Sequence, residues 1–259
     1  MLPRTPPGSR QLAVLTPAQQ LTAGRTVRRL SQLMVGLVLY GVSMAMMIRS
    51  TLGLDPWDVL HDGITRRTGL SFGTVVIIVG VLVLLLWIPL RQWPGLGTVA
   101  NAVVIGLATD ASLAVIPEPS DMPVRLALLV GGVAANGLAG ALYIGAQFGA
   151  GPRDGLMTGL VRRTGRSVRL VRTSLEVLVL AVGWLLGGVV GLGTVLYALA
   201  IGPLVQLFLP RCIVELPDFP SAQRRVASTT DESSVTMTST EVNRSSVNHC
   251  SRNESTRPS

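Results

Sequence analysis

The chain lacks the charged surface of a soluble domain. Only 14% of its 259 residues are charged, whereas a soluble domain carries roughly 25%. Uncharged residues gather in long runs, such as 75–90, 126–150 and 177–210. A membrane-spanning helix needs roughly 20 mostly apolar residues, and none of these runs shows the alternation of a soluble amphipathic helix. The sequence therefore favours a membrane protein over one large soluble core.

Residues that commonly hold metals are also scarce. The chain has two histidines and two cysteines, and Cys212 and Cys250 do not have the spacing of a zinc or redox motif. No P-loop, GxSxG, HExxH or kinase pattern is present. We therefore expect no metal, no cofactor and no enzymatic activity.

Basic residues outnumber acidic ones by 22 to 14, but they are not clustered as in a nucleic-acid binder. The arginines flank hydrophobic runs, as the positive-inside rule describes, and five of them lie within residues 162–172. This distribution favours both termini in the cytoplasm. We expect the lipid bilayer as partner, no nucleic acid, and a small molecule or ion as the candidate substrate; the oligomeric state is left open.

The hydrophobic runs predict an all-α transmembrane bundle of about six spans. They cover approximately residues 31–48, 72–90, 98–116, 126–148, 173–190 and 193–209. The polar ends, 1–30 and 211–259, are predicted to be disordered, because they cannot bury enough apolar area to offset the entropy of ordering.

Two polar segments separate spans in the two halves of the chain. In the first, residues 55–68, Asp55 is the expected N-cap and Pro56 the first residue of a short amphipathic helix. The second segment covers residues 151–164. The sequence leaves open whether these segments lie at the membrane interface or re-enter the bilayer.

The phrase GLGTVANAVVIG at residues 95–106 recurs as GLGTVLYALAIG at residues 191–202, with eight of twelve positions identical. A shift of 96 aligns the two halves without a gap, so residues 31–116 and 124–210 are predicted repeats of three spans each. An odd number of spans places the second repeat upside down in the membrane. The alternative is that the polar segments re-enter, which leaves the repeats parallel.

A G-x-x-P-x-D-x-L motif occurs once in each repeat. Its residues are Gly53, Pro56, Asp58 and Leu60 in the first copy, and Gly149, Pro152, Asp154 and Leu156 in the second. One interpretation is a helix boundary: Gly permits a left-handed turn, Pro begins a helix, and Asp complements its dipole. The other places both helix N-termini and both aspartates at a shared substrate or ion site.

Further polar residues fall within the predicted spans. Glu176 aligns with Gly80 and is either an i, i+4 partner of Arg172 or an intramembrane carboxylate facing a cavity. Asp110 and Gln206 occupy matching positions. Tyr40 with Asn136, and Asn101 with Tyr197, form two more such pairs, which serve either a site or helix packing.

The two motif copies, LGLDPWDVL and FGAGPRDGL, resemble the signature of the bacterial YczE/YyaS/YitT-type multispan membrane proteins, in their YczE-like branch. The similarity covers roughly residues 31–210, and the RRTG segments at 66–69 and 162–165 support it. It implies an integral protein of the inner membrane. We expect a transporter or permease-like protein for a small solute, or alternatively a scaffold that assists another membrane or secretion process without transporting anything. Polar pairs at one depth would favour transport, and a wholly apolar interior would favour the scaffold.

Overall fold

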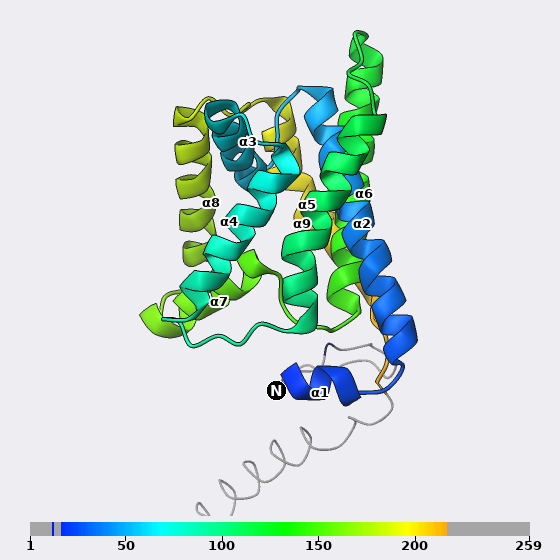
Figure 1. Cartoon of the computed structure of the whole chain (residues 1–259), viewed down its shortest axis with the longest axis vertical. Coiled ribbons are helices and arrows are strands. Elements are labelled where there is room, and N and C mark those ends of the chain that lie inside the picture. The colour runs from blue at the N-terminus through cyan, green and yellow to red at the C-terminus, as the bar shows by residue number, and fades with distance from the viewer. Residues whose placement is uncertain (1–11, 13–16, 217–259) are drawn as a thin grey trace, which may run out of the picture. The chain divides into compact units, whose positions relative to one another are not determined.

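The computed structural model describes Leu12 and residues 17–216, and this part of the chain is helical without any strand. The helices are α1 (Pro17–Thr22), α2 (Thr26–Ser50), α3 (Pro56–Thr68), α4 (Phe72–Trp87), α5 (Leu96–Val115), α6 (Met122–Gly145), α7 (Pro152–Thr164), α8 (Val168–Leu185) and α9 (Leu192–Cys212). The predicted all-α fold is confirmed (Figure 1).

Four helices in the described part of the chain are long and apolar enough to cross a membrane: α2, α5, α6 and α9. A fifth candidate is formed by α3 and α4, which meet at a bend of 115°. Six spans were predicted, and that number stays a prediction. Alone, α4 has only 16 residues, and the 18-residue α8 carries Arg169, Arg172 and Glu176.

Helix positions follow the offset at which the sequence matches itself. In the first half, α2 to α5 begin at residues 26, 56, 72 and 96. In the second half, α6 to α9 begin at residues 122, 152, 168 and 192, each 96 residues later. Figure 1 shows the two short members, α3 and α7, at opposite ends of the helix bundle.

The glycine of each RRTG segment ends one helix, and the serine two residues later caps the next helix. Gly69 and Gly165 follow α3 and α7 with φ values of 72° and 64°, in the left-handed region that glycine tolerates. Ser71 and Ser167 then accept a hydrogen bond from the backbone N–H three residues later and so cap α4 and α8.

Two loop-to-helix hydrogen bonds join the halves reciprocally. The Gly97 N–H donates to the Phe148 carbonyl at 2.9 Å, and the Gly193 N–H donates to the Leu52 carbonyl at 2.8 Å. Gly193 matches Gly97, and Phe148 matches Leu52, at the same offset of 96. When residue i of one half contacts j of the other and the converse also holds, the contact has the form of a two-fold axis.

Two arginines make a second reciprocal pair. Arg29 Nε on α2 donates to the Ala146 carbonyl at 2.9 Å, and Arg125 Nε on α6 donates to the Ser50 carbonyl at 2.9 Å. Each guanidinium satisfies a carbonyl at the C-terminal end of the other helix, where intrahelical donors are missing. The long helices α2 and α6 are therefore fastened to each other at both ends.

Small residues let the central helices approach closely, as the glycine-rich sequence of α6 predicts. A Cβ atom at Gly132 would lie 2.8 Å from Cγ of Met47 on α2. At Gly137 it would lie 2.7 Å from Cβ of Leu204 on α9.

The structure differs from the predicted tail boundaries. Residues 17–22 and 26–30 are helical, because the fully buried Arg29 donates to the carbonyls of Gln20 and Gln147 at 2.7 and 2.8 Å and lies 4.2 Å above the Phe148 ring. At the other end, Val214 is buried and its N–H donates to the Gly145 carbonyl. The rest of the predicted tails, residues 1–11, 13–16 and 217–259, lies outside the described residues.

Candidate functional site

A cavity of about 380 Å³ lies among the helices of both halves. This volume suits a small molecule, since ligand sites span roughly 300–1,000 Å³. Its polar and aromatic lining comprises Tyr40, Asp55, Trp57, His61, Asn101, Asn136, Tyr143, Arg153, Asp154, Arg172, Glu176, Tyr197 and Gln206.

Tyrosine and asparagine are concentrated at this cavity. The chain has three tyrosines, and all of them line it. The two asparagines of the described residues, Asn101 and Asn136, line it as well. The interior is therefore not wholly apolar, and its polar side chains converge on one place.

The predicted polar pairs meet here. Tyr40, Asn136, Asn101 and Tyr197 all line the cavity, so both pairs at the 96-residue offset contribute to one site. The Tyr197 hydroxyl donates to Asn136 Oδ1 at 3.1 Å, and Asn136 Nδ2 donates to the Ser43 hydroxyl at 2.9 Å. These bonds satisfy a fully buried amide.

Arg153 joins the two motif copies. Its Nη1 lies 3.6 Å from Asp55 Oδ2, and its Nη2 lies 3.5 Å from Asp58 Oδ1. The guanidinium carbon lies 5.1 Å from the centre of the Trp57 ring, within cation–π range. Because Asp55 and Asp58 are 1% and 0% exposed, these carboxylates depend on Arg153 for a counter-charge.

Asp58 lies behind the cavity wall rather than on it. Its Oδ1 is 3.1 Å from His61 Nδ1, and its backbone N–H donates to Asp55 Oδ1 at 2.8 Å. The latter bond confirms Asp55 as the N-cap of α3, with Pro56 beginning the helix as predicted. Asp58 therefore contributes charge to the site through Arg153.

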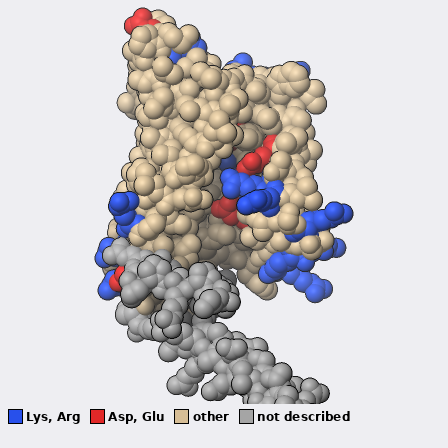
Figure 2. Space-filling model, turned by 180° about the vertical axis from the view of Figure 1, so that it is seen from behind, with Lys and Arg blue, Asp and Glu red and all other residues tan. Residues whose placement is uncertain are grey.

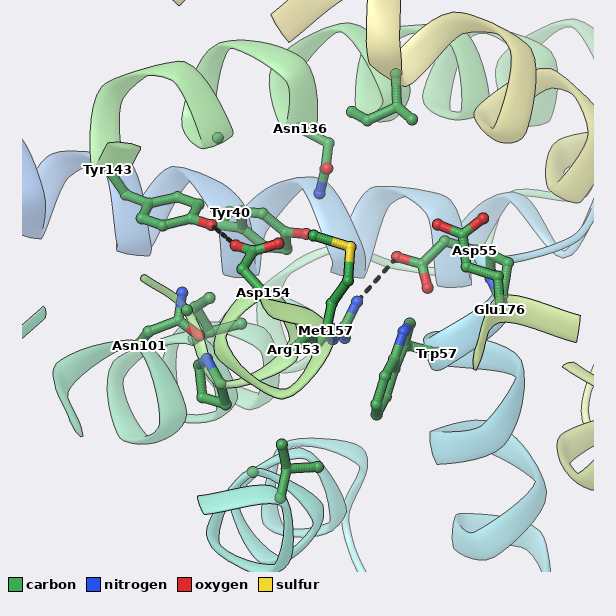
Figure 3. A pocket seen from close by; sticks show the side chains of 18 of the residues that line it. Tyr40, Asp55, Trp57, Asn101, Asn136, Tyr143, Arg153, Asp154, Met157 and Glu176 are labelled. Carbon is green, nitrogen blue, oxygen red and sulfur yellow. Dashed lines mark hydrogen bonds and ion pairs between the residues drawn. The ribbon is translucent and has the colours of Figure 1, made fainter. Parts of the chain in front are cut away.

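Asp154 lines the cavity and accepts a hydrogen bond from the Tyr143 hydroxyl at 2.6 Å. Figure 3 shows Arg153 and Asp154 turned to opposite sides of the pocket, toward Asp55 and Tyr143 respectively. At the N-cap of α7, Gly151 stands where α3 has Asp55, so no side chain caps this helix. The two predicted aspartates thus share one cluster but occupy different positions in it.

Glu176 lies on the cavity wall and is also paired with Arg172, at 2.9 Å between Oε1 and Nε. Both interpretations of this residue therefore describe part of its environment. The side chains of Arg172 and Glu176 are 56% and 40% exposed, so the cavity reaches the surface beside α8. Figure 2 shows acidic and basic side chains in a hollow of this face, with further basic side chains toward its lower edge.

The cavity opens at α8 and α9 because this pair differs from its counterpart. On α4 and α5, Gly73 and Gly106 lie so close that a Cβ atom at Gly106 would be 2.5 Å from the Gly73 carbonyl. The matching residues are Arg169 and Gly202, and a Cβ atom at Gly202 would meet nothing within 4 Å. Arg169 on α8 thus stands where Gly73 allows the close contact between α4 and α5.

Asp110 is not part of the cavity. Its carboxylate accepts from the Ser71 hydroxyl at 2.6 Å and from the Gly73 N–H at 2.7 Å, and so holds the first turn of α4. It borders a separate, open depression together with Arg49 and Asp62. Gln206, at the matching position, does line the cavity.

The other motif residues set helix boundaries. Gly53 and Gly149 have φ values of 118° and 110°, which favour glycine. Pro152 begins α7 as Pro56 begins α3. Leu156 is buried against Val83 and its neighbours, while Leu60 borders Gly183 of α8.

The sequence did not indicate Arg153, Trp57 or Tyr143 as site residues. The motif comparison concentrated on identical positions, whereas Arg153 and Trp57 match each other at the 96-residue offset and differ. A cation and an aromatic ring at matching positions of the two motif copies are the sequence signal that could have indicated this contact. Within the described residues, no group of three or more His, Cys, Asp or Glu side chains is arranged to hold a metal ion.

Comparison with known proteins matches the membrane assignment. The sequence family described as "Family of unknown function (DUF6198)" matches residues 27–210. An uncharacterized protein of Haemophilus influenzae is 40% identical over 193 residues, covering 74% of this chain and 88% of the relative. The membrane protein YczE of Bacillus subtilis is 32% identical, over 74% of this chain and 90% of its own.

YyaS of Bacillus subtilis is 28% identical over 74% of this chain and 96% of its own. The resemblance to YczE and YyaS that the duplicated motif predicts is therefore confirmed. No solved structure matches the chain.

Proposed function

The chain belongs to the family of unknown function DUF6198 and is similar to the membrane protein YczE. We propose that it is a membrane transporter for a small polar solute. The observation that carries the proposal is the polar cavity. All three tyrosines, both asparagines of the described part and five charged side chains converge there, inside a bundle in which α2, α5, α6 and α9 are long and apolar enough to cross a membrane. A scaffold needs no such cavity, and buried polar groups are costly to keep without a use.

The symmetry of the site supports the same proposal. We infer that the halves are inverted three-span repeats in the inner membrane, with both termini cytoplasmic. The reciprocal bonds of Gly97 and Gly193, and of Arg29 and Arg125, support this inference. In inverted-repeat transporters the substrate site lies where the repeats meet, at interrupted helices, and α3 and α7 contribute Asp55 and Asp154 at such a place.

The geometry also favours an access route. Helices α4 and α5 pack closely, but at the matching place in the second half α8 carries charged side chains. The cavity therefore meets the surface beside α8. A solute can therefore reach Asp154 and Tyr197 in this conformation, and release on the other side needs a second conformation.

Counterflow in proteoliposomes tests the proposal. Purified full-length protein is first screened against amino acids, amines, sugars and organic acids for a shift in thermal midpoint. Vesicles preloaded with a stabilising solute are then assayed for uptake of its radiolabelled form. We expect uptake above that of empty liposomes, and loss of it in Gly140→Leu, since Gly140 lines the cavity and has room for a Cβ atom.

The control is Glu118→Gln, which removes an exposed charge outside the cavity. It should transport like the wild type. If no stabilising solute shows counterflow, transport is wrong and the scaffold hypothesis replaces it.

A further inference from the structure

The charges around the cavity do not balance. Carboxylates come from Asp55, Asp154 and Glu176 on its wall and from Asp58 behind Arg153. The opposing cations of the cavity wall are two guanidinium groups, Arg153 and Arg172. Arg153 pairs with Asp55 and Asp58, whereas Arg172 is hydrogen-bonded to Glu176 and acts on Asp154 only at longer range.

Asp154 is exposed within the cavity and is the wall carboxylate that no ion pair found among the described residues includes. Its contact is the neutral hydroxyl of Tyr143. A protonated His61 would pair with Asp58, 3.1 Å away, and would still leave Asp154 unmatched. The first turn of α7 contributes only about half a positive charge, which is less than a full counter-ion.

Aromatic rings border the same space. Tyr40 and Tyr143 pack edge to face with ring centroids 6.4 Å apart, and Tyr197 lines the cavity from α9. The Trp57 face is already taken by Arg153, which shows that this wall accommodates a cation. Electron-rich rings around a carboxylate are the usual recognition chemistry for an organic ammonium group.

We infer that the cavity takes a ligand with a cationic ammonium group, held by Asp154 and surrounded by the tyrosine rings. This deepens the proposed function, since it names the chemical class of the solute, and it rests on that proposal only for what happens after binding. The ammonium group belongs either to a small free solute or to an amphiphile whose chain remains in the bilayer.

Binding to the purified full-length protein in a neutral detergent tests the inference without any transport step. The probes are choline and its uncharged carbon isostere, 3,3-dimethyl-1-butanol, which match in shape and differ in charge. We expect choline to raise the thermal midpoint and to give a calorimetric isotherm, and the isostere to do neither. Asp154→Asn should weaken choline binding by about thirtyfold or more, while Glu118→Gln binds like the wild type.

A third probe, decyltrimethylammonium below its micelle concentration, separates the two sources. Preferential binding of choline indicates a free solute, and preferential binding of the long-chain cation indicates an amphiphile; either result supports the cationic class. Asp154→Glu, which keeps the charge, should retain more affinity than Asp154→Asn, so a folding defect at this position is recognised.

Equal binding of choline and its isostere, or no binding of any cation, overturns the inference. Such a result leaves the transport proposal intact if counterflow of a neutral or anionic solute is found. Cation binding without counterflow has the opposite meaning: the site assignment stands and the transport proposal fails.

Discussion

Nη2 of Arg153 lies 3.5 Å from Oδ1 of Asp58, and this contact joins the first turn of α7 to the first turn of α3. The two residues belong to different copies of one motif, 95 positions apart. A second contact, from Nη1 to Asp55, makes the arginine the shared counter-charge of two buried carboxylates.

Replacing Arg153 by Met should destabilise the protein by about 3–5 kcal/mol, because two buried carboxylates lose their partner. Thermal unfolding in detergent measures the effect. Adding Asp55→Asn and Asp58→Asn to the same variant should recover part of the loss. The exposed Arg166→Met is the control and should stay within about 0.5 kcal/mol of wild type; equal stability of both arginine variants would contradict the assignment.

Gly106→Ala and Gly202→Ala form a matched pair of substitutions. At Gly106 the new methyl group would lie 2.5 Å from the Gly73 carbonyl and 2.7 Å from Ile77 Cγ1, so we expect a loss of about 1–3 kcal/mol. At Gly202 it meets nothing within 4 Å, and a helical Gly→Ala change should be neutral or stabilising by up to about 1 kcal/mol. Thermal midpoints of the two variants compare them, and similar losses would show that α8 and α9 also pack closely.

Arg29→Met should be more damaging than Arg125→Met. Arg29 donates to three carbonyls and stacks on Phe148, whereas the hydrogen bond found for Arg125 is to Ser50. We expect a loss of about 3 kcal/mol or more for the first and about 1 kcal/mol for the second. Denaturation of the purified variants checks the order, and the reverse order would place the stronger fastening at the other end of α2.

Cysteine labelling tests the inverted arrangement. Thr68→Cys and Thr164→Cys, at the exposed ends of α3 and α7, are introduced separately after Cys212 and Cys250 are changed to Ser. A membrane-impermeant maleimide should label position 68 in intact cells and position 164 only in inside-out vesicles. Labelling of both from the same side would favour parallel repeats with re-entrant segments.

Sequence reasoning succeeded where the cause of a structure is local. The N-cap Asp55 with Pro56, the left-handed Gly53 and Gly149, and the Arg172–Glu176 pair all depend on residues a few positions apart. Each is decided by backbone geometry or by helix spacing, which the sequence displays directly.

Sequence reasoning failed where a residue's interaction partner is not its neighbour along a helix. Asp110 resembled an intramembrane site residue until Ser71 and Gly73 were found to bind it. The predicted first tail ended at residue 30 because nothing near Arg29 indicates that Ala146 and Gln147 receive its hydrogen bonds. Tyr143 and Asp154 are only 11 positions apart, but they meet across the turn between α6 and α7, where helical spacing does not apply.

Gly80 and Glu176 occupy matching positions and both line the cavity, but Gly80 is packed near Ala102 whereas Glu176 is a partly exposed charged side chain. A symmetric dimer of separate three-span subunits takes both positions from one gene, so it must carry the same residue on both sides. A closed side and a charged opening cannot then be encoded together. Two halves in one chain are free of that constraint, because each position mutates independently, and an opening beside α8 without a matching one beside α4 can then be encoded.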